Sequence, residues 1–147
     1  MKQYKWKFLF IFRSDAYRLA HPNDSSFHVY RGQILSVKEI EQLRTNVNKL
    51  VTMNGFCSTS RNRAMAIKFA KNVLFDIEVD FKKYPQLVLA DISSSSHFEE
   101  EEEMLFDLVT VFRIERVSNR VYSENFYRCI GRGRRRLAHT YLSNCQQ

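Results

Sequence analysis

The chain has 147 residues, 44% of them hydrophobic and 14% aromatic, which supports one packed domain and excludes an intrinsically disordered chain. The net charge is +7, but five arginines and no acid lie between Arg128 and the C-terminus, which leaves about +2 on the preceding residues. A domain that is basic over its whole surface, as in many nucleic-acid-binding proteins, is therefore excluded.

Three cysteines, Cys57, Cys129 and Cys145, form no CxxC pair. Their odd number and wide spacing argue against a disulfide framework and against a zinc site, so we expect a reducing, cytoplasmic location. Near the N-terminus, the apolar run 8–12 is shorter than the hydrophobic core of a signal peptide and far shorter than a membrane span. We therefore expect no signal peptide and no membrane association.

The first half of the chain predicts a short strand and two helices. Residues 1–26 stay poorly defined, because the apolar run fits a strand or a helix equally well and a turn-rich segment follows it. Residues 27–30 alternate like a strand, which ends at Arg31. Ser36 and Glu39 form a capping box ahead of apolar residues spaced three and four apart, which predicts a helix followed by a short extended piece.

A second helix is predicted over 61–71, with Ser60 as its N-cap. Residues 75–81 then alternate between apolar and acidic side chains, which is typical of a half-buried strand. Later strands are predicted over 87–92, 102–106 and 110–117, with a turn over 118–120. Helices that come early and strands that follow in close succession predict an α+β domain with a largely antiparallel sheet.

Five consecutive glutamates, 99–103, lead directly into the strand predicted over 102–106. An acidic run of this kind is ordinarily a solvated loop. Repulsion between neighbouring carboxylates is best tolerated where a cation or a chemical task compensates it, so the position beside a strand favours a functional role. Residues two apart face the same side of a strand. The run allows three such pairs, namely 99/101, 100/102 and 101/103.

Three features of the chain stand at the ends of predicted strands. They are Arg31, the sequence Ser58-Thr59-Ser60, and Glu101-x-Glu103. Each alone has an ordinary explanation: a surface arginine, a helix cap or a solvated acid. In this order and with these flanks, they resemble the arginine–serine–glutamate signature of arginine-specific mono-ADP-ribosyltransferases. The resemblance covers about residues 27–122.

The resemblance implies a split β-sandwich of mostly antiparallel strands with one or two helices, and a cleft between two packed sheets. Members of the family usually carry a helical lobe before the arginine strand, and we expect that lobe to be missing here. The chain would then comprise a poorly defined segment 1–26, a catalytic core 27–122, and an Arg-rich, flexible tail 123–147.

The resemblance also implies roles for individual residues toward NAD, which would serve as a substrate. The family's catalytic glutamate directly precedes the apolar strand, which selects Glu103 to stabilise the oxocarbenium-like ribose, with Glu101 orienting the arginine acceptor. Ser58 would hold the Glu103 carboxylate. The residues implied in binding NAD are Arg31, Gly32, Ser58, Thr59 and Ser60. Gly32 would allow a close approach to the nicotinamide amide, Thr59 and Ser60 would also support the strand end, and no metal is implied.

The implied partner is a protein that presents an arginine side chain, and we expect the enzyme to be a monomer. Two other functions stay open: an inactive binding module of the same fold, and a nucleic-acid-binding protein that acts through the Arg-rich tail. Other conspicuous side chains are given ordinary roles. Phe56 or Phe69 could pack near the nicotinamide, but both are expected in the core. His28 is expected to point outward from its strand, and His97 is expected in a serine-rich loop.

Overall fold

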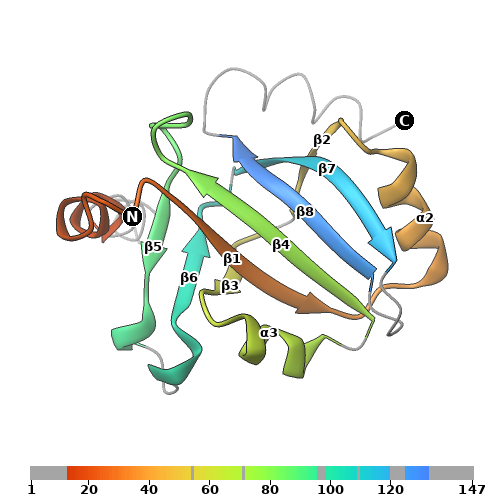
Figure 1. The fold of residues 1–147 in the computed structure, drawn as a ribbon, viewed down its shortest axis with the longest axis horizontal. Helices are drawn as coiled ribbons and strands as arrows, with labels where there is room; N and C mark the ends of the chain where they lie inside the picture. The colour runs from red at the N-terminus through yellow and green to blue at the C-terminus, as the bar shows by residue number, and fades with distance from the viewer. Residues whose placement is uncertain are drawn as a thin grey trace, which may run out of the picture.

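The computed structural model describes residues 13–53, 55–70, 72–95, 99–108, 110–119 and 125–132. Two helices, eight strands and two short 3-10 turns follow a helical segment at residues 13–20 (Figure 1). Their bounds are β1 Ser26–Gln33, α2 Val37–Thr45, β2 Leu50–Thr52, β3 Cys57–Ser60, α3 Arg63–Phe69, β4 Val73–Asp80, β5 Leu89–Asp91, η1 Ser93–Ser95, η2 Glu99–Glu101, β6 Glu103–Phe106, β7 Val111–Asn119 and β8 Asn125–Arg132.

The strands form one sheet in the order β2-β7-β8-β4-β1-β3-β6-β5. Among the described strands, β4 and β8 alone pair in parallel, so the predicted α+β class with a mostly antiparallel sheet is confirmed. β1 pairs with β4 along its whole length, but it meets β3 at the single pair Tyr30–Ser60. The sheet is therefore split between β1 and β3, into a part of five strands and a part of three.

The core is formed by the apolar faces of these strands. On β4, Phe75, Ile77 and Val79 are buried while the acidic residues between them are half-exposed, so the predicted alternation is confirmed. The rings of Phe106 on β6 and Phe112 on β7 meet edge to face, with 5.1 Å between centroids. Because these two strands belong to different parts of the split sheet, this contact ties the two parts together.

The predicted helix after Ser36 is confirmed as α2, including its capping box with Glu39. The second predicted helix is shorter than expected, since α3 begins at Arg63 and its N-cap is Asn62. The prediction that Ser60 caps this helix is wrong. Ser60 is the last residue of β3, and its hydroxyl donates to the backbone oxygen of Glu101 instead.

The helical segment at residues 13–20 was not predicted, since both helices expected from the sequence follow Arg31. Its apolar stripe is short: Tyr17 is buried, while Leu19 is 83% exposed. Arg18 fastens the segment to the chain ahead of β5, because its guanidinium donates to the carbonyls of Pro85 and Leu87. None of the helices in the described ranges is long and apolar enough to cross a membrane.

The C-terminal end of the core also differs from the prediction. A turn was expected over 118–120, but β7 continues through residue 118 and ends at Asn119. The core was expected to end at residue 122, but β8 follows and belongs to the same sheet. β8 lies between β7 and β4 and pairs with both (Figure 1). Its pairing with β4, which sets Asn125 beside Val73, is a long-range contact that the Arg- and Gly-rich composition did not reveal. The rest of the predicted tail, 133–147, lies outside the described residues.

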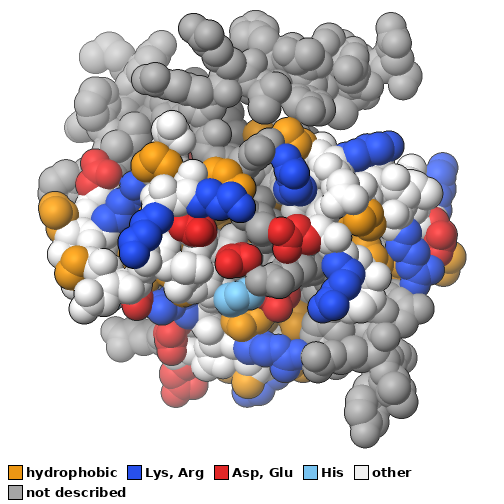
Figure 2. Space-filling view, turned by 45° about the horizontal axis from the view of Figure 1, so that its top comes forward, with side chains coloured by type: hydrophobic (Ala, Val, Ile, Leu, Met, Phe, Trp, Pro, Cys, Tyr) orange, Lys and Arg blue, Asp and Glu red, His pale blue; other side chains and the backbone are white. Residues whose placement is uncertain are grey.

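Charges of both signs are mixed on the face of the molecule that Figure 2 shows. Figure 2 shows acidic side chains lying between lysines and arginines on one face of the molecule, with no segregation of the two signs among the coloured residues. This distribution agrees with the small excess of positive charge that the sequence places ahead of Arg128. Nucleic-acid binding through the Arg-rich tail stays a prediction, because most of that tail lies outside the described ranges.

Candidate active site

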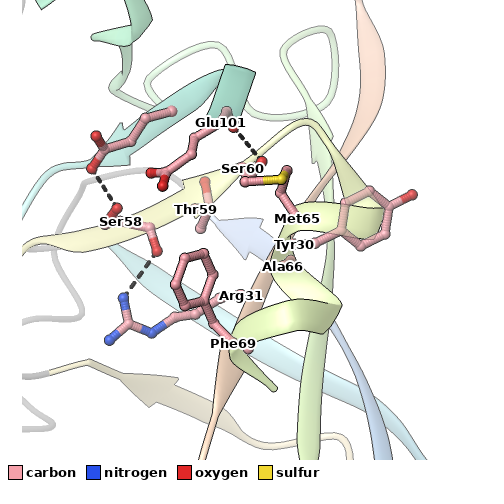
Figure 3. A pocket seen from close by; sticks show the side chains of 11 residues that line it. Tyr30, Arg31, Ser58, Thr59, Ser60, Met65, Ala66, Phe69 and Glu101 are labelled. Carbon is pink, nitrogen blue, oxygen red and sulfur yellow. Dashed lines mark hydrogen bonds between the residues drawn. The ribbon is translucent and has the colours of Figure 1, made fainter. Parts of the chain in front are cut away.

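A pocket of about 200 Å³ lies where the sheet splits (Figure 3). All seven site residues expected from the sequence line it, and four further residues complete the wall. The expected residues are Arg31, Gly32, Ser58, Thr59, Ser60, Glu101 and Glu103, and the additional ones are Tyr30, Met65, Ala66 and Phe69. Three segments far apart in sequence, at β1, β3 and the β6 entry, therefore converge as predicted.

Ser58 and Glu103 are joined by a hydrogen bond across neighbouring strands. The Ser58 hydroxyl donates to Glu103 Oε1 at 2.6 Å, and both side chains are partly buried. β3 and β6 are paired so that Ser60 lies opposite Glu103 and Ser58 lies opposite Leu105, so Ser58 reaches diagonally to the carboxylate. A hydrogen bond to a carboxylate is short and strong, and this one fixes the direction of Glu103 into the pocket.

Glu101 and Glu103 both face the pocket, but not because they alternate on one strand. Glu101 ends the turn η2, Glu103 begins β6, and Glu102 between them has φ 45°. This left-handed conformation rotates the chain between the two carboxylates and leaves the Glu102 side chain exposed. Glu101 and Glu103 therefore share a side as the 101/103 pair allowed, but a left-handed residue and not strand alternation brings this about.

Arg31 bridges the split in the sheet. From the end of β1, its Nη1 donates to the backbone oxygen of Ser58 on β3 at 2.9 Å. Its Nε is buried and has no hydrogen-bond partner among the described residues. Buried N–H groups are rarely left unpaired in folded proteins, so this unpaired donor is an exception at a residue that lines the pocket.

Gly32 is required by the packing of α3 on β1. A Cβ at this position would lie 2.8 Å from the Cα of Ala70 and would overlap the backbone oxygen of Ala66. The close approach expected here therefore involves the helix, and it brings α3 near enough for Phe69 to line the pocket. Whether the Gly32 backbone also approaches a ligand stays a prediction.

The hydroxyls of Thr59 and Ser60 are engaged with the protein. Thr59 is buried and donates to the backbone oxygen of Met104 at 2.8 Å, which fastens β3 to β6. Ser60 donates to the backbone oxygen of Glu101 and accepts a bond from the Asn62 amide at 2.9 Å. Both residues support the strand end, as the resemblance implied, and their direct contact with NAD stays a prediction.

Two aromatic side chains expected in the core are exposed instead. Phe56 is 50% exposed and Phe69 is 60% exposed, and Phe69 lines the pocket. Phe69 is the last residue of α3, three residues after the buried Ala66, and its ring lies at the pocket (Figure 3).

The described histidines lie outside the pocket lining. His28 is half-exposed, as expected for an outward position, and its Nδ1 lies 2.5 Å from Asp76 on β4. His97 lies outside the described residues. Cys57 is buried, and burial raises the pKa of its thiol to about 11, so it stays protonated at neutral pH and is a poor nucleophile. Within the described ranges, no group of histidine, cysteine or carboxylate side chains is arranged to hold a metal.

Residues 1–128 match the model of a protein family described as NAD:arginine ADP-ribosyltransferase. This match covers most of the chain, including β1, β3 and β6 with their site residues. The chain belongs to this family. Membership in the ADP-ribosyltransferase family agrees with the resemblance that the arginine, serine and glutamate motifs indicated. A comparison with curated proteins found no match.

Solved structures of ADP-ribosyltransferases share the fold. HopU1 of Pseudomonas syringae has 24% sequence identity and a TM-score of 0.62, over 72% of this chain and 45% of its own. Exoenzyme S of Pseudomonas aeruginosa, in complex with 14-3-3 protein beta and carba-NAD, has 14% identity and a TM-score of 0.58, over 81% of this chain and 57% of its own. C3stau2 of Staphylococcus aureus, solved with NAD, has 13% identity and a TM-score of 0.56, over 75% and 63%. The chain therefore spans about half to two-thirds of the length of these structures.

Proposed function

We propose that this chain is an NAD-dependent mono-ADP-ribosyltransferase that modifies arginine side chains of proteins and releases nicotinamide. One observation carries the proposal: the Ser58–Glu103 hydrogen bond lies in the same pocket as Glu101 and Arg31. Family membership supports ADP-ribosyl transfer, and the second carboxylate, Glu101, supports arginine as the acceptor.

NAD is the substrate that suits the pocket. Two similar structures were solved with NAD or with carba-NAD. Pockets that enclose a whole drug-sized ligand usually measure about 300 Å³ or more. The pocket of about 200 Å³ therefore suits the nicotinamide and its ribose, while the remainder of the dinucleotide extends beyond the described wall. Phe69 offers an exposed ring at this pocket, and Arg31 forms part of its wall.

Cleavage of the nicotinamide–ribose bond sends the bonding electrons to nicotinamide and leaves positive charge on the ribose. A carboxylate fixed beside that ribose stabilises the developing oxocarbenium-like state. Glu103 takes this role, because Ser58 holds its carboxylate toward the pocket. The bond from Ser58 means that little reorganisation is needed as the charge develops.

The acceptor arginine is a poor nucleophile, because its guanidinium is charged at all physiological pH values. A carboxylate can orient the guanidinium through two parallel hydrogen bonds and accept a proton as the new bond forms. Glu101 takes this role. One guanidinium nitrogen supplies the electron pair to the ribose carbon, and its proton passes to Glu101, so charge and atoms balance.

Arg31 contributes to NAD binding from the end of β1. Its guanidinium is anchored by Nη1 on the Ser58 carbonyl, which leaves the planar group oriented at the pocket wall. A guanidinium pairs well with phosphate oxygens because of its fork geometry. Arg31 therefore serves both to bridge the two parts of the sheet and to hold the pyrophosphate side of NAD.

Incubation with labelled NAD and an arginine-rich protein tests this proposal. The wild-type chain should transfer label to the acceptor, and Glu103→Ala should abolish the transfer while preserving the fold. A matched control is Glu41→Ala, which removes a carboxylate from the exposed surface of α2. NAD binding without turnover would indicate a binding module of the same fold. Neither binding nor transfer by the wild-type chain would refute the enzymatic proposal.

A further inference from the structure

The turn that carries Glu101 is held by Ser60, the last residue of β3, and by the two residues that follow it. The Ser60 hydroxyl donates to Glu101 O, the Arg61 amide donates to Glu102 O at 3.1 Å, and Asn62 Nδ2 lies 3.5 Å from Glu100 O. The last of these bonds is long and correspondingly weak. Three consecutive residues thus bind three consecutive carbonyls, which fixes the path of the chain into β6.

These hydrogen bonds are needed because the turn contains a strained residue. Glu102 has φ 45°, in the left-handed region that costs an ordinary L-residue about 1–2 kcal/mol. Such a conformation persists only where surrounding contacts determine it. The Arg61 amide binds the carbonyl of this same residue, so the position of Arg61 sets the orientation of the turn on which Glu101 sits.

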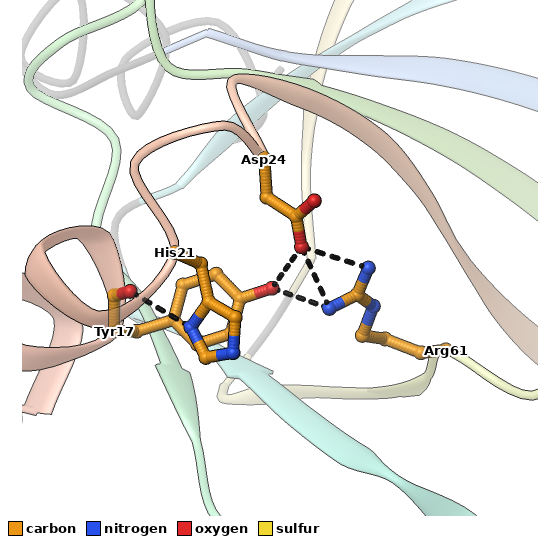
Figure 4. A network of polar contacts seen from close by, with 4 residues as sticks. All are labelled: Tyr17, His21, Asp24 and Arg61. Atoms are coloured by element: carbon orange, nitrogen blue, oxygen red, sulfur yellow. Dashed lines mark hydrogen bonds and ion pairs between the residues drawn. The ribbon is translucent and has the colours of Figure 1, made fainter.

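The side chain of Arg61 is held in turn by the segment ahead of β1 (Figure 4). Its Nη1 donates to the Tyr17 hydroxyl at 2.5 Å, and Nη1 and Nη2 both lie 3.2 Å from Asp24 Oδ2. The guanidinium also stands 4.7 Å from the centre of the Phe27 ring. Four contacts therefore converge on one guanidinium from residues far from it in sequence.

Tyr17 and Asp24 can both hold the Arg61 guanidinium at physiological pH. Tyr17 is buried, and burial raises the pKa of its phenol to about 12, so it remains a neutral hydroxyl at physiological pH. Tyr17 also donates to Asp24 Oδ2 at 3.4 Å, and it stacks on His21 in the same segment. The Arg61 and Asp24 side chains are 29% and 38% exposed, so the ion pair alone contributes little to stability. Its consequence is geometric, because it fixes the residue whose amide holds Glu102.

We propose that Arg61 is a positioning residue for Glu101, and that Asp24 and Tyr17 anchor it. This inference rests on the proposed role of Glu101 toward the arginine acceptor. Glu103 is held separately by Ser58, so loosening the Arg61 anchor should disturb acceptor transfer more than NAD cleavage. The segment 13–24, which precedes every motif residue, would thereby contribute to acceptor reactivity.

The test compares two activities of the same variants: transfer to an arginine acceptor, and hydrolysis of NAD by water. Asp24→Asn preserves side-chain volume, Tyr17→Phe removes only a hydroxyl, and Arg61→Ala removes the anchored group. A misplacement near 1 Å can cost about 100-fold in rate, so transfer relative to hydrolysis should fall by roughly 5- to 100-fold. Arg61→Lys should restore part of the ratio, because an ammonium still pairs with Asp24. Glu41→Gln, which removes an exposed ion pair with Arg44 on α2, should leave the ratio unchanged.

A second readout does not depend on activity. The Arg61 amide, bonded to Glu102 O, should exchange its hydrogen about tenfold faster in Asp24→Asn and Arg61→Ala than in the wild-type chain. A lower transfer-to-hydrolysis ratio with faster exchange supports the proposal. An unchanged ratio of transfer to hydrolysis, including an equal fall of both activities, overturns the proposal. Unchanged exchange of the Arg61 amide also overturns it. A wild-type chain without either activity would refute the proposed function instead, and the amide exchange would still decide whether the Arg61 anchor holds the turn.

Discussion

The Ser58 hydroxyl reaches Glu103 at 2.6 Å across two paired strands, while the Ser58 carbonyl accepts a bond from Arg31 at 2.9 Å. Ser58 therefore contacts both of the other motif residues, one through its side chain and one through its backbone. Only the side-chain contact can be removed by substitution. This division makes the contribution of the Glu103 contact separable from the contribution of the strand connection.

Ser58→Ala should lower the rate of nicotinamide release with little change in NAD affinity. A hydrogen bond to a charged group contributes about 1.5–3 kcal/mol, which corresponds to roughly a 10- to 100-fold loss of rate. Steady-state release of nicotinamide measures it. Ser36→Ala is the matched control, because Ser36 caps α2 away from the pocket lining and should cost about 1 kcal/mol of stability without changing the rate.

Gly32→Ala should destabilise the fold and weaken NAD binding together. The new methyl group would overlap the Ala66 carbonyl and push α3 from β1, at a cost of about 1–3 kcal/mol. Thermal unfolding and NAD titration measure the two effects. At Gly55, where no atom lies within 4 Å of a built Cβ but φ is +95°, alanine should lower stability through backbone strain alone and leave NAD affinity intact.

Substitutions at Glu102 should rank by their tolerance of the left-handed conformation. Glu102→Gly should keep or raise stability by up to about 1 kcal/mol, whereas the β-branched Glu102→Val should lower it by about 1–2 kcal/mol. Chemical denaturation of both variants measures the order. Equal stability of the glycine and valine variants would contradict the conformation described for this turn.

Stability should fall at alkaline pH as the Cys57 thiol is forced to ionise. Burial raises its folded pKa from 9.0 to about 11, so the folded chain retains a proton that the unfolded chain loses. The stability that the protonated Cys57 thiol contributes is fully present below pH 9 and is lost as pH rises from 9 to 11. Unfolding free energies measured across this range should decline more steeply for the wild-type chain than for Cys57→Ala. Parallel curves would contradict the burial of this thiol.

Local patterns in the sequence predicted much of the fold. The capping box at Ser36 and the alternation over 75–81 each determine structure through neighbouring residues, and both appear as expected. Features set by contacts between distant residues were missed. β8 is defined by two strands that precede it, and the helical segment at 13–20 is held by Arg18 on a distant loop.

The same distinction applies to the pocket. The resemblance implied that Arg31, Ser58 and Glu103 belong to one site, and all three line the same pocket. The exposure of Phe69 depends on how α3 packs on β1, and the anchor joins Arg61 to Asp24, which lies 37 positions earlier in the sequence. Neither leaves a periodic signal. The expected monomeric state and cytoplasmic location stay predictions.

Glu101→Gln tests most directly whether Glu101 acts on the arginine acceptor while Glu103 acts on the ribose of NAD. Both arginine transfer and NAD hydrolysis are measured for the same preparation, with circular dichroism to verify the fold. Loss of a positioned acid or base costs about 10²- to 10⁴-fold, so transfer should fall by at least about 100-fold while NAD hydrolysis persists. Transfer that survives Glu101→Gln, or an equal loss of both activities, would contradict the roles assigned to Glu101 and Glu103.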